Sequence, residues 1–245
     1  MAGIDPVTLA AAAAMTFGAA YVRGLTGFGM AIILVPLLGL IVTPAEAVVL
    51  GILLQVLIGP VGIKTIYADA HRKSVLNIAA YAVVATPCGI WLLQQTTPAV
   101  ARLLIVLIAI GAFILVLLPP RAEIRPGPKE TALTGIASGI LNGFAAMPGP
   151  PVVPYYLRQP IPPAEARASM LLVFFATAIA GTISSLALGL ASWRLLLLSL
   201  ILFPPLVAGN WLGAKSFGQI PAHIWRLFVA LTLGLAAISA VSRLF

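Results

Sequence analysis

Long uncharged apolar runs alternate along the chain with short polar turns. Uncharged runs cover 74–101, 168–193 and 195–214, and each is about as long as the roughly 20 residues that cross a bilayer as a helix. The pattern predicts continuous helices at 45–67, 74–95, 98–118, 165–189, 193–214 and 222–243. Four of these begin at or just after a proline, where a missing backbone N–H costs nothing: Pro44, Pro98, Pro163 and Pro221.

Composition agrees with a chain that lies in a membrane. Of the 245 residues, 61% are hydrophobic and 8% charged, and the mean hydropathy is +1.12, which leaves too few polar groups to cover a water-soluble surface. A transmembrane barrel would need alternating polar and apolar residues, and 103–118 shows no such alternation. The sequence therefore predicts an all-α polytopic membrane protein.

Two further apolar segments, 7–42 and 131–158, are interrupted by glycine and proline, and each precedes the same signal. The first copy has Thr-Gly-Phe-Gly at 26–29 and Pro-Ala-Glu-Ala at 44–47, and the second has Asn-Gly-Phe at 142–144 and Pro-Ala-Glu-Ala at 163–166. A duplicated broken segment is typical of transporters built from repeats. We predict a first repeat over 1–118, a linker over 119–130 and a second repeat over 131–245.

The broken segments decide how the repeats face each other. Pieces 7–22 and 30–42 would span roughly 24 and 20 Å at 1.5 Å per residue, less than a core of about 30 Å. Each segment is therefore expected to enter, break and return, either as a re-entrant hairpin or as two short crossings. Each repeat then adds three full helices, an odd number, so the repeats are inverted, with eight to ten helical pieces in all.

Positive charges test this arrangement, with Arg23 left out because it lies in the expected break. Inverted repeats with the N-terminus outside and the linker in the cytoplasm place ten cations inside and three outside; parallel repeats give at best eight and five, so the positive-inside rule favours inversion. The ten are Lys64, Arg72, Lys73, Arg121, Arg125, Lys129, Arg158, Arg167, Lys215 and Arg226, and the three are Arg102, Arg194 and Arg243. The net charge of +8 follows from topology, and no nucleic-acid partner is expected.

The breaks are the first candidates for a binding site. Helix ends freed inside a membrane are tolerated only in protein or beside a water-filled cavity, and a helix N-terminus there favours an anion. The candidates are Thr26, Gly27, Phe28 and Gly29 in the first copy, and Asn142, Gly143, Pro148 and Gly149 in the second. The alternative is that Gly27 and Gly143 only allow close helix packing.

Two polar side chains extend this list. Arg23 lies within the expected first break, and an intramembrane cation is a functional candidate by default, although it could also snorkel to an interface. Its counterpart in the second copy is Gly139, so the charge does not follow the repeat. Gln55 could hydrogen-bond an oxyanion, as could Asn210 with lower priority, and interhelical bonding is the alternative for both.

Acidic groups argue against other functions. Glu46 and Glu165 lie in the first turn after a proline, where a carboxylate complements the helix dipole. No acid or histidine pair that could support intramembrane proteolysis is apparent, and the phosphate loop of ATP-driven transport is missing. We predict a protein that is not an enzyme and uses no cofactor or metal.

The ordered motifs Gly24-Leu25-Thr26-Gly27-Phe28-Gly29, Val35-Pro36-Leu37-Leu38 and Pro44-Ala45-Glu46-Ala47, with a weaker echo from Gly135 to Ala166, resemble the TauE/SafE family. The resemblance spans essentially the whole chain. It implies an inner-membrane permease that exports sulfite, sulfoacetate or a related small anion.

The leading hypothesis is a secondary transporter in which Arg23 and the two broken-helix ends bind a small sulfur-containing anion near the bilayer midplane, with alternating access. The alternatives are a non-transporting membrane scaffold subunit and an anion channel. The expected partners are the anion and the lipid bilayer, and a homodimer is compatible with the sequence. The multi-pass chain is expected in the cell inner (plasma) membrane.

Overall fold

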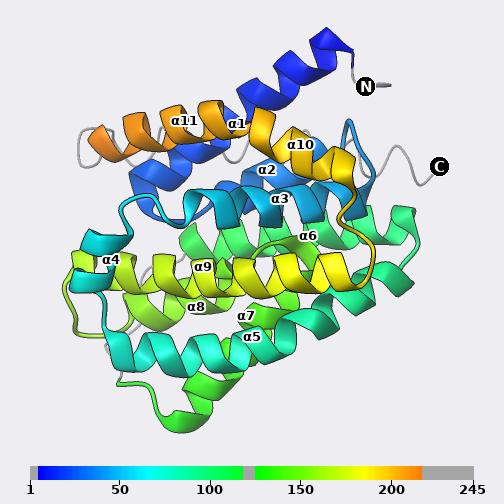
Figure 1. Ribbon diagram of the computed structural model, residues 1–245. Coiled ribbons are helices and arrows are strands. Elements are labelled where there is room, and N and C mark those ends of the chain that lie inside the picture. Colours follow the sequence, from blue (N-terminus) through cyan, green and yellow to red (C-terminus); the bar gives the residue numbers. More distant parts are fainter. Residues whose placement is uncertain (1–4, 118–124, 217–245) are drawn as a thin grey trace.

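The computed structural model describes residues 5–117 and 125–216, and in these ranges the chain forms eleven helices and no strand (Figure 1). The predicted first repeat contains α1 (Pro6–Thr26), α2 (Met30–Leu38), α3 (Pro44–Ile58), α4 (Ile63–Asp69), α5 (Arg72–Gln95) and α6 (Pro98–Leu117). Helix α7 (Pro128–Ala145) begins in the predicted linker, and the predicted second repeat continues with α8 (Gly149–Leu157), α9 (Pro163–Ala187), α10 (Trp193–Ile201) and α11 (Phe203–Lys215). The helix predicted at 222–243 and residues 119–124 of the linker lie outside the described residues.

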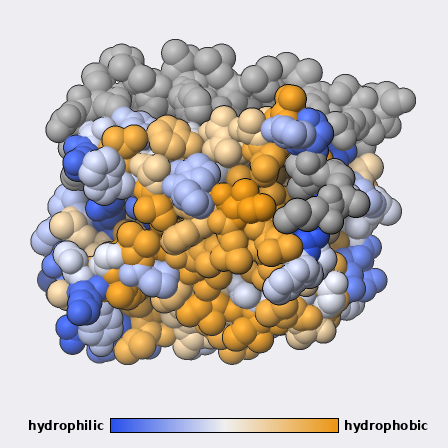
Figure 2. Space-filling model, turned by 45° about the horizontal axis from the view of Figure 1, so that its top comes forward, coloured by the Kyte–Doolittle hydropathy of each residue, from blue (hydrophilic) through white to orange (hydrophobic). Residues whose placement is uncertain are grey.

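The helices predicted at 74–95, 98–118 and 165–189 are confirmed as α5, α6 and α9, which also have the length and hydropathy to span a membrane. Up to five spans result if two bent helix pairs each count as one. Figure 2 shows the matching surface: an apolar band covers the middle of this face, with hydrophilic residues gathered toward its lateral ends. The chain is a polytopic membrane protein.

Two continuous helices predicted from the sequence are wrong, and eight to ten helical pieces were too few. The helix expected at 45–67 is α3 and α4, which meet at 84°, and that at 193–214 is α10 and α11, which meet at 43°. Pro60 and the left-handed Gly62 lie in the first bend, and Pro204 and Pro205 follow the second. Proline lacks the N–H that would continue the ladder.

Two parallel helix pairs form the most extensive contacts of the fold. Along α5 and α7, Ile78 lies against Gly135 and Thr86 against Gly143, and along α1 and α11, Phe17 lies against Gly209 and Tyr21 against Gly213. The backbones touch at these glycines, where a Cβ would collide with a carbonyl oxygen of the facing helix. Small residues allow such close approach in membranes, where lipid supplies no hydrophobic drive.

The central helices α3 and α9 instead run in opposite directions. Ile52 lies against Gly181, whereas Gly59, one residue past the end of α3, lies against Phe175; Figure 1 shows the same antiparallel course. The first turns of α3 and α10 are joined by an ion pair between Glu46 Oε1 and Arg194 Nη1 at 3.3 Å. These two helices therefore begin at the same end of the molecule.

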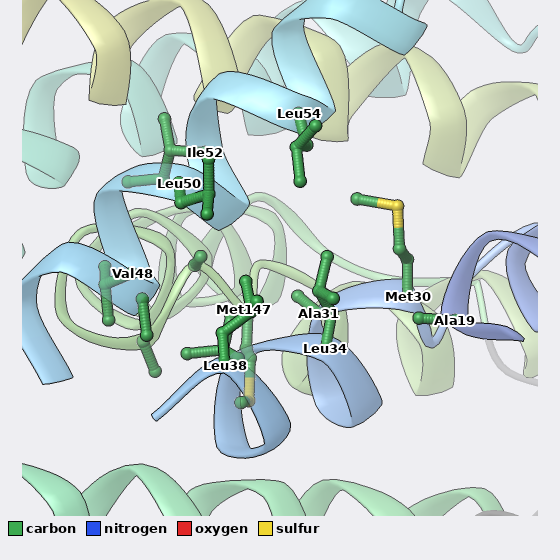
Figure 3. Close-up of a cluster of buried hydrophobic side chains, with 14 of the residues drawn as sticks. Ala19, Met30, Ala31, Leu34, Leu38, Val48, Leu50, Ile52, Leu54 and Met147 are labelled. Atoms are coloured by element: carbon green, nitrogen blue, oxygen red, sulfur yellow. The ribbon is translucent and has the colours of Figure 1, made fainter. Parts of the chain in front are cut away.

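The largest apolar cluster surrounds the short helix α2. Leu34 and Leu38 of α2 and Leu50 and Leu54 of α3 are fully buried in it, and Met147 of the second break joins them. Figure 3 shows these side chains together with Ala19 of α1. This packing fixes both breaks against α3.

Candidate functional site

The first break is shorter than expected because α1 continues to Thr26. Gly24 stays helical and packs against the backbone of α11, so Arg23 lies in the last turn of α1 and not in the break; the prediction that placed it there was wrong. Gly27 ends the helix with a φ of 85°, a left-handed conformation that glycine adopts at no steric cost. The α1 piece has 21 residues, not the 16 expected, and covers about 31 Å.

Thr26 holds the turn that joins α1 to α2. Its hydroxyl donates to a backbone carbonyl, lying 2.7 Å from Phe28 O and 2.9 Å from Val22 O, and it accepts the Phe28 N–H at 3.2 Å. The role of Thr26 is therefore structural: its hydrogen bonds stabilise the turn between α1 and α2.

The N-terminus of α2, directly after this turn, has no side-chain cap. Gly29 is the N-cap residue and makes no side-chain hydrogen bond, so the N–H groups of the first helical residues, Met30, Ala31 and Ile32, have no partner within the helix. These three residues line a cavity. The first copy therefore supplies backbone donors and the positive end of a helix dipole.

The second break, which the sequence predicts over 143–151, is also shorter, because α7 runs to Ala145 and α8 starts at Gly149. Ala146 takes the left-handed conformation, with a φ of 56°. Two side chains hold the turn: Ser138 donates to Pro148 O at 2.9 Å, and Gln55 of α3 donates to Ala146 O at 2.9 Å. Gln55 therefore positions the second break with its amide N–H.

The N-terminus of α8 is poorer in donors than that of α2. Its first three residues are Gly149, Pro150 and Pro151, and proline has no N–H. Only Gly149 can present a backbone donor from this first turn. The predicted asymmetry between the copies thus extends to the backbone itself.

Both breaks meet at one narrow cavity. It is lined by the two helix starts, by Arg23, and by aromatic rings of the turn and of α9. The lining residues are Arg23, Phe28, Gly29, Met30, Ala31, Ile32, Gln55, Gly59, Met147, Pro148, Gly149, Phe174 and Phe175. Only about 30 Å³ is open to the centres of water molecules, room for about two waters.

Arg23 is the cation of this central cavity. Its Nη1 donates to Asn210 Oδ1 of α11 at 2.6 Å, and no acidic side chain of the described residues forms an ion pair with it. A neutral amide thus positions the guanidinium without neutralising its positive charge, so the charge can still interact with an anion. Asn210, which the sequence ranked below Gln55, is the residue that positions it.

Six of the ten predicted site residues therefore line the cavity: Arg23, Phe28, Gly29, Gln55, Pro148 and Gly149. The other four, Thr26, Gly27, Asn142 and Gly143, lie outside its lining. Asn142 is fully buried and donates to Thr177 O at 2.9 Å, with its Oδ1 unpartnered. Gly143 packs on the backbone of α5, as the alternative interpretation of this glycine expected.

Sequence reasoning missed Arg167 of α9, which was counted only as a loop charge. Its Nη2 donates to Gly24 O at 2.9 Å, and its side chain lies across Gly27, where a Cβ would come within 2.6 Å of Arg167 Cγ. The contact joins α9 to the end of α1, two helices far apart in sequence. No local motif signals it, because the cognate position of the first copy is Val48.

The acidic residues have the structural roles predicted for them. Glu46 accepts the Thr43 N–H at 2.9 Å while Thr43 accepts the Glu46 N–H at 3.3 Å, which forms a capping box at α3. Glu165 likewise lies in the first turn of α9. Carboxylates at these positions stabilise helix starts.

A polytopic helical bundle with interrupted helices meeting around a partly buried cation is the arrangement of a membrane transport protein. Comparison with known families agrees: the model of the family described as "Sulfite exporter TauE/SafE" matches residues 12–240, so the chain belongs to this family. Members of the family are transporters, and the protein is a transporter and not an enzyme.

A curated relative gives a second match. The chain is similar to the "Probable sulfite/organosulfonate exporter TauE" of Cupriavidus necator (strain H16), with 27% identity over 230 residues that cover 89% of this chain and 88% of the relative. No solved structure matches the chain.

Proposed function

We propose that this protein exports a small sulfur-containing oxyanion, such as sulfite or sulfoacetate, across the cell inner membrane. The observation that carries the proposal is the meeting of the α2 and α8 helix starts with Arg23 at one cavity. The family membership and the printed name of the Cupriavidus relative supply the substrate class.

The chemistry of the cavity suits an oxyanion. Met30, Ala31 and Ile32 offer backbone N–H groups at the positive end of α2, a natural anion site. Arg23 adds a charge that is held by an amide, and a guanidinium can bind two oxygens of one anion at once. We therefore infer that the first repeat supplies most of the binding energy.

The depth of the break supports a site near the bilayer midplane. Helix α2 has nine residues, which cover about 14 Å, roughly half of a core about 30 Å thick. The same holds for α8, also nine residues long. Where each short helix ends at its own membrane surface, the two helix starts meet midway, and α1, which covers about 31 Å, must then tilt or extend beyond the core.

Inverted repeats and alternating access are part of the proposal. The antiparallel course of α3 and α9, which are equivalent helices of the two repeats, supports inversion. So does the Glu46–Arg194 ion pair, because parallel repeats would place these residues on opposite sides of the membrane. The N-terminus is then outside, and the linker is cytoplasmic.

Export of an anion needs no coupling ion in this scheme. An inside-negative potential drives a monovalent anion outward by about 2.3 kcal/mol per 100 mV, which corresponds to roughly 50-fold accumulation outside. A uniporter is sufficient, and proton or sodium coupling is the alternative that ion-gradient dependence would reveal.

Flux of radiolabelled sulfite and sulfoacetate in proteoliposomes tests the proposal. The Arg23→Gln variant should lose at least about tenfold in flux, because a hydrogen bond to a charged group contributes about 1.5–3 kcal/mol. The matched control is Arg194→Gln, which removes a cation from the exposed Glu46 pair and should keep flux within about twofold.

Other outcomes point to the alternatives. Wild-type protein that neither moves nor binds either anion would favour the scaffold subunit. Flux that never saturates would favour a channel. Saturable flux that Arg23→Gln leaves unchanged in rate and substrate preference would reject the role of Arg23 while keeping the transporter.

A further inference from the structure

A second cavity shares Arg23 with the central one. It is bounded by α1, α4, α9 and α11, and its polar lining residues are Arg23, Arg167 and Asn210. About 670 Å³ is open to the centres of water molecules here, against about 30 Å³ in the central cavity. The second cavity is therefore wide enough to admit a small organic anion, and the central one is constricted.

Arg23 is the side chain that the two cavities share. Its hydrogen bond to Asn210 lies on the side of the second cavity, since Asn210 lines that cavity and not the central one. A bound oxyanion could replace the amide as the acceptor, and a charged acceptor makes a stronger bond than a neutral one. Arg23 is thus placed to receive an anion from one cavity and present it to the other.

Arg167 gives this second cavity a cation of its own. It donates to Gly24 O at 2.9 Å and lies across Gly27, which holds its stem against the last turn of α1, next to Arg23. Two guanidinium groups on one cavity wall repel each other unless an anion lies between them. Most other lining residues, including Leu171 and Val207, are apolar and suit a short carbon chain.

We propose that this second cavity is an anion-loading vestibule, in which Arg167 captures the oxyanion and Arg23 passes it to the central cavity. This inference rests on the proposed export function for its direction. The vestibule lies at the end of the molecule where α4 carries Lys64 and α11 ends at Lys215, both counted on the cytoplasmic side by the positive-inside rule. An exporter would load its substrate from this side.

Sided uptake kinetics test the vestibule. In inside-out membrane vesicles, which expose the cytoplasmic face, Arg167→Gln should raise the KM for sulfoacetate about ten- to a hundredfold, the loss of a charge-assisted bond, while changing the maximal rate less than about threefold. Arg167→Lys, which keeps the charge, should recover part of the affinity. Lys64→Gln removes an exposed cation from the same end of the molecule outside the cavity lining and serves as the matched control.

Right-side-out vesicles complete this experiment. There the KM of Arg167→Gln should stay within about threefold of wild type, because an anion entering from outside meets the central cavity first. For a uniporter the maximal rate in right-side-out vesicles should fall instead, because the ratio of maximal rate to KM must stay equal in the two directions. An equal KM shift from both faces, or a loss of maximal rate at unchanged KM in inside-out vesicles, would overturn the loading role. Thermal unfolding of each purified variant separates these results from misfolding.

A chemical probe tests the charge of the vestibule without transport. In a Cys88→Ser background, which removes the chain's exposed cysteine, Ala208→Cys places a thiol in the vestibule wall. The ratio of its labelling rates by anionic and cationic methanethiosulfonates should fall about tenfold on adding Arg167→Gln and stay unchanged on adding Lys64→Gln. A constant ratio would reject the anion vestibule. A falling ratio in a protein that moves no anion would keep the vestibule and reject export.

Discussion

At the scale of single residues, the left-handed turn at the end of α1 brings Arg167 of α9 close to Arg23. Gly27 and Gly29 both have a positive φ, 85° and 89°, and so both favour glycine. Only Gly27 also lies under a side chain, that of Arg167, whereas a Cβ at Gly29 would meet Val22 Cγ1 at an ordinary 3.5 Å. Comparing substitutions at these two glycines therefore distinguishes the cost of backbone strain from the cost of losing the contact with Arg167.

The variants Gly27→Ala and Gly29→Ala should both lower stability by about 1–2 kcal/mol through backbone strain. Gly27→Ala should cost about 1–3 kcal/mol more, because the new Cβ displaces Arg167. Thermal unfolding in detergent measures both. In an Arg167→Ala background the two costs should become equal, and a difference that persists there would contradict the contact as its cause.

The sequence could place six residues of the central cavity because each copy marks its break with glycine next to a polar or aromatic residue. Arg167 and Phe174 could not be placed, and Asn210 was ranked below Gln55. They reach the site through contacts of α9 and α11 with α1 and the break, and such contacts depend on helix packing that leaves no local pattern. Their helices were predicted, but the faces they present were not.

At the scale of elements, hydropathy predicted where helices lie in the chain but not where their axes turn. Helices α5, α6 and α9 match their predicted ranges because a proline or charge bounds each one. The bends at Gly59–Gly62 and at Leu202 lie inside apolar runs. An apolar run indicates that a segment is buried in lipid or protein. The residues on both sides of a bend are equally apolar, so hydropathy does not show where the bend lies.

The parallel pair α5 and α7 allows a test of backbone packing. Gly139→Ala places a Cβ on the carbonyl oxygen of Ala82, so the helices must separate, and we expect a loss of about 1–3 kcal/mol. Gly111→Ala is the matched control, since nothing lies within 4 Å of a Cβ there, and it should be neutral or slightly stabilising. Thermal unfolding compares them, and equal effects would refute backbone contact as the basis of this pair.

At the scale of the whole molecule, the two helix pairs with the most extensive contacts each join a helix of one predicted repeat to a helix of the other. Helix α1 of the first repeat packs on α11 of the second, and α7 of the second packs on α5 of the first. The first helix of each broken segment thus packs against the other predicted repeat. These pairs join the two halves through the most extensive contacts of the fold, so any alternating access would have to move α1 with α11 and α5 with α7 as units.

Sidedness is the property of the whole molecule that distinguishes inverted from parallel repeats. Inversion places the turn before α10 outside and the end of α11 inside; parallel repeats in their best orientation place these two points the other way round. Single cysteines at Ser192 and Ser216, in a Cys88→Ser background, report both points. Inverted repeats predict that an impermeant thiol reagent labels Ser192→Cys in intact cells and Ser216→Cys only after permeabilisation.

Two further positions control this labelling. Thr97 precedes α6 and Asp69 ends α4, and both arrangements place Thr97→Cys outside and Asp69→Cys inside. Labelling of Ser216→Cys in intact cells, with Thr97→Cys labelled and Asp69→Cys protected, would establish parallel repeats. The Glu46–Arg194 contact at 3.3 Å would then have to join opposite membrane surfaces about 30 Å apart, which is why we expect the inverted result.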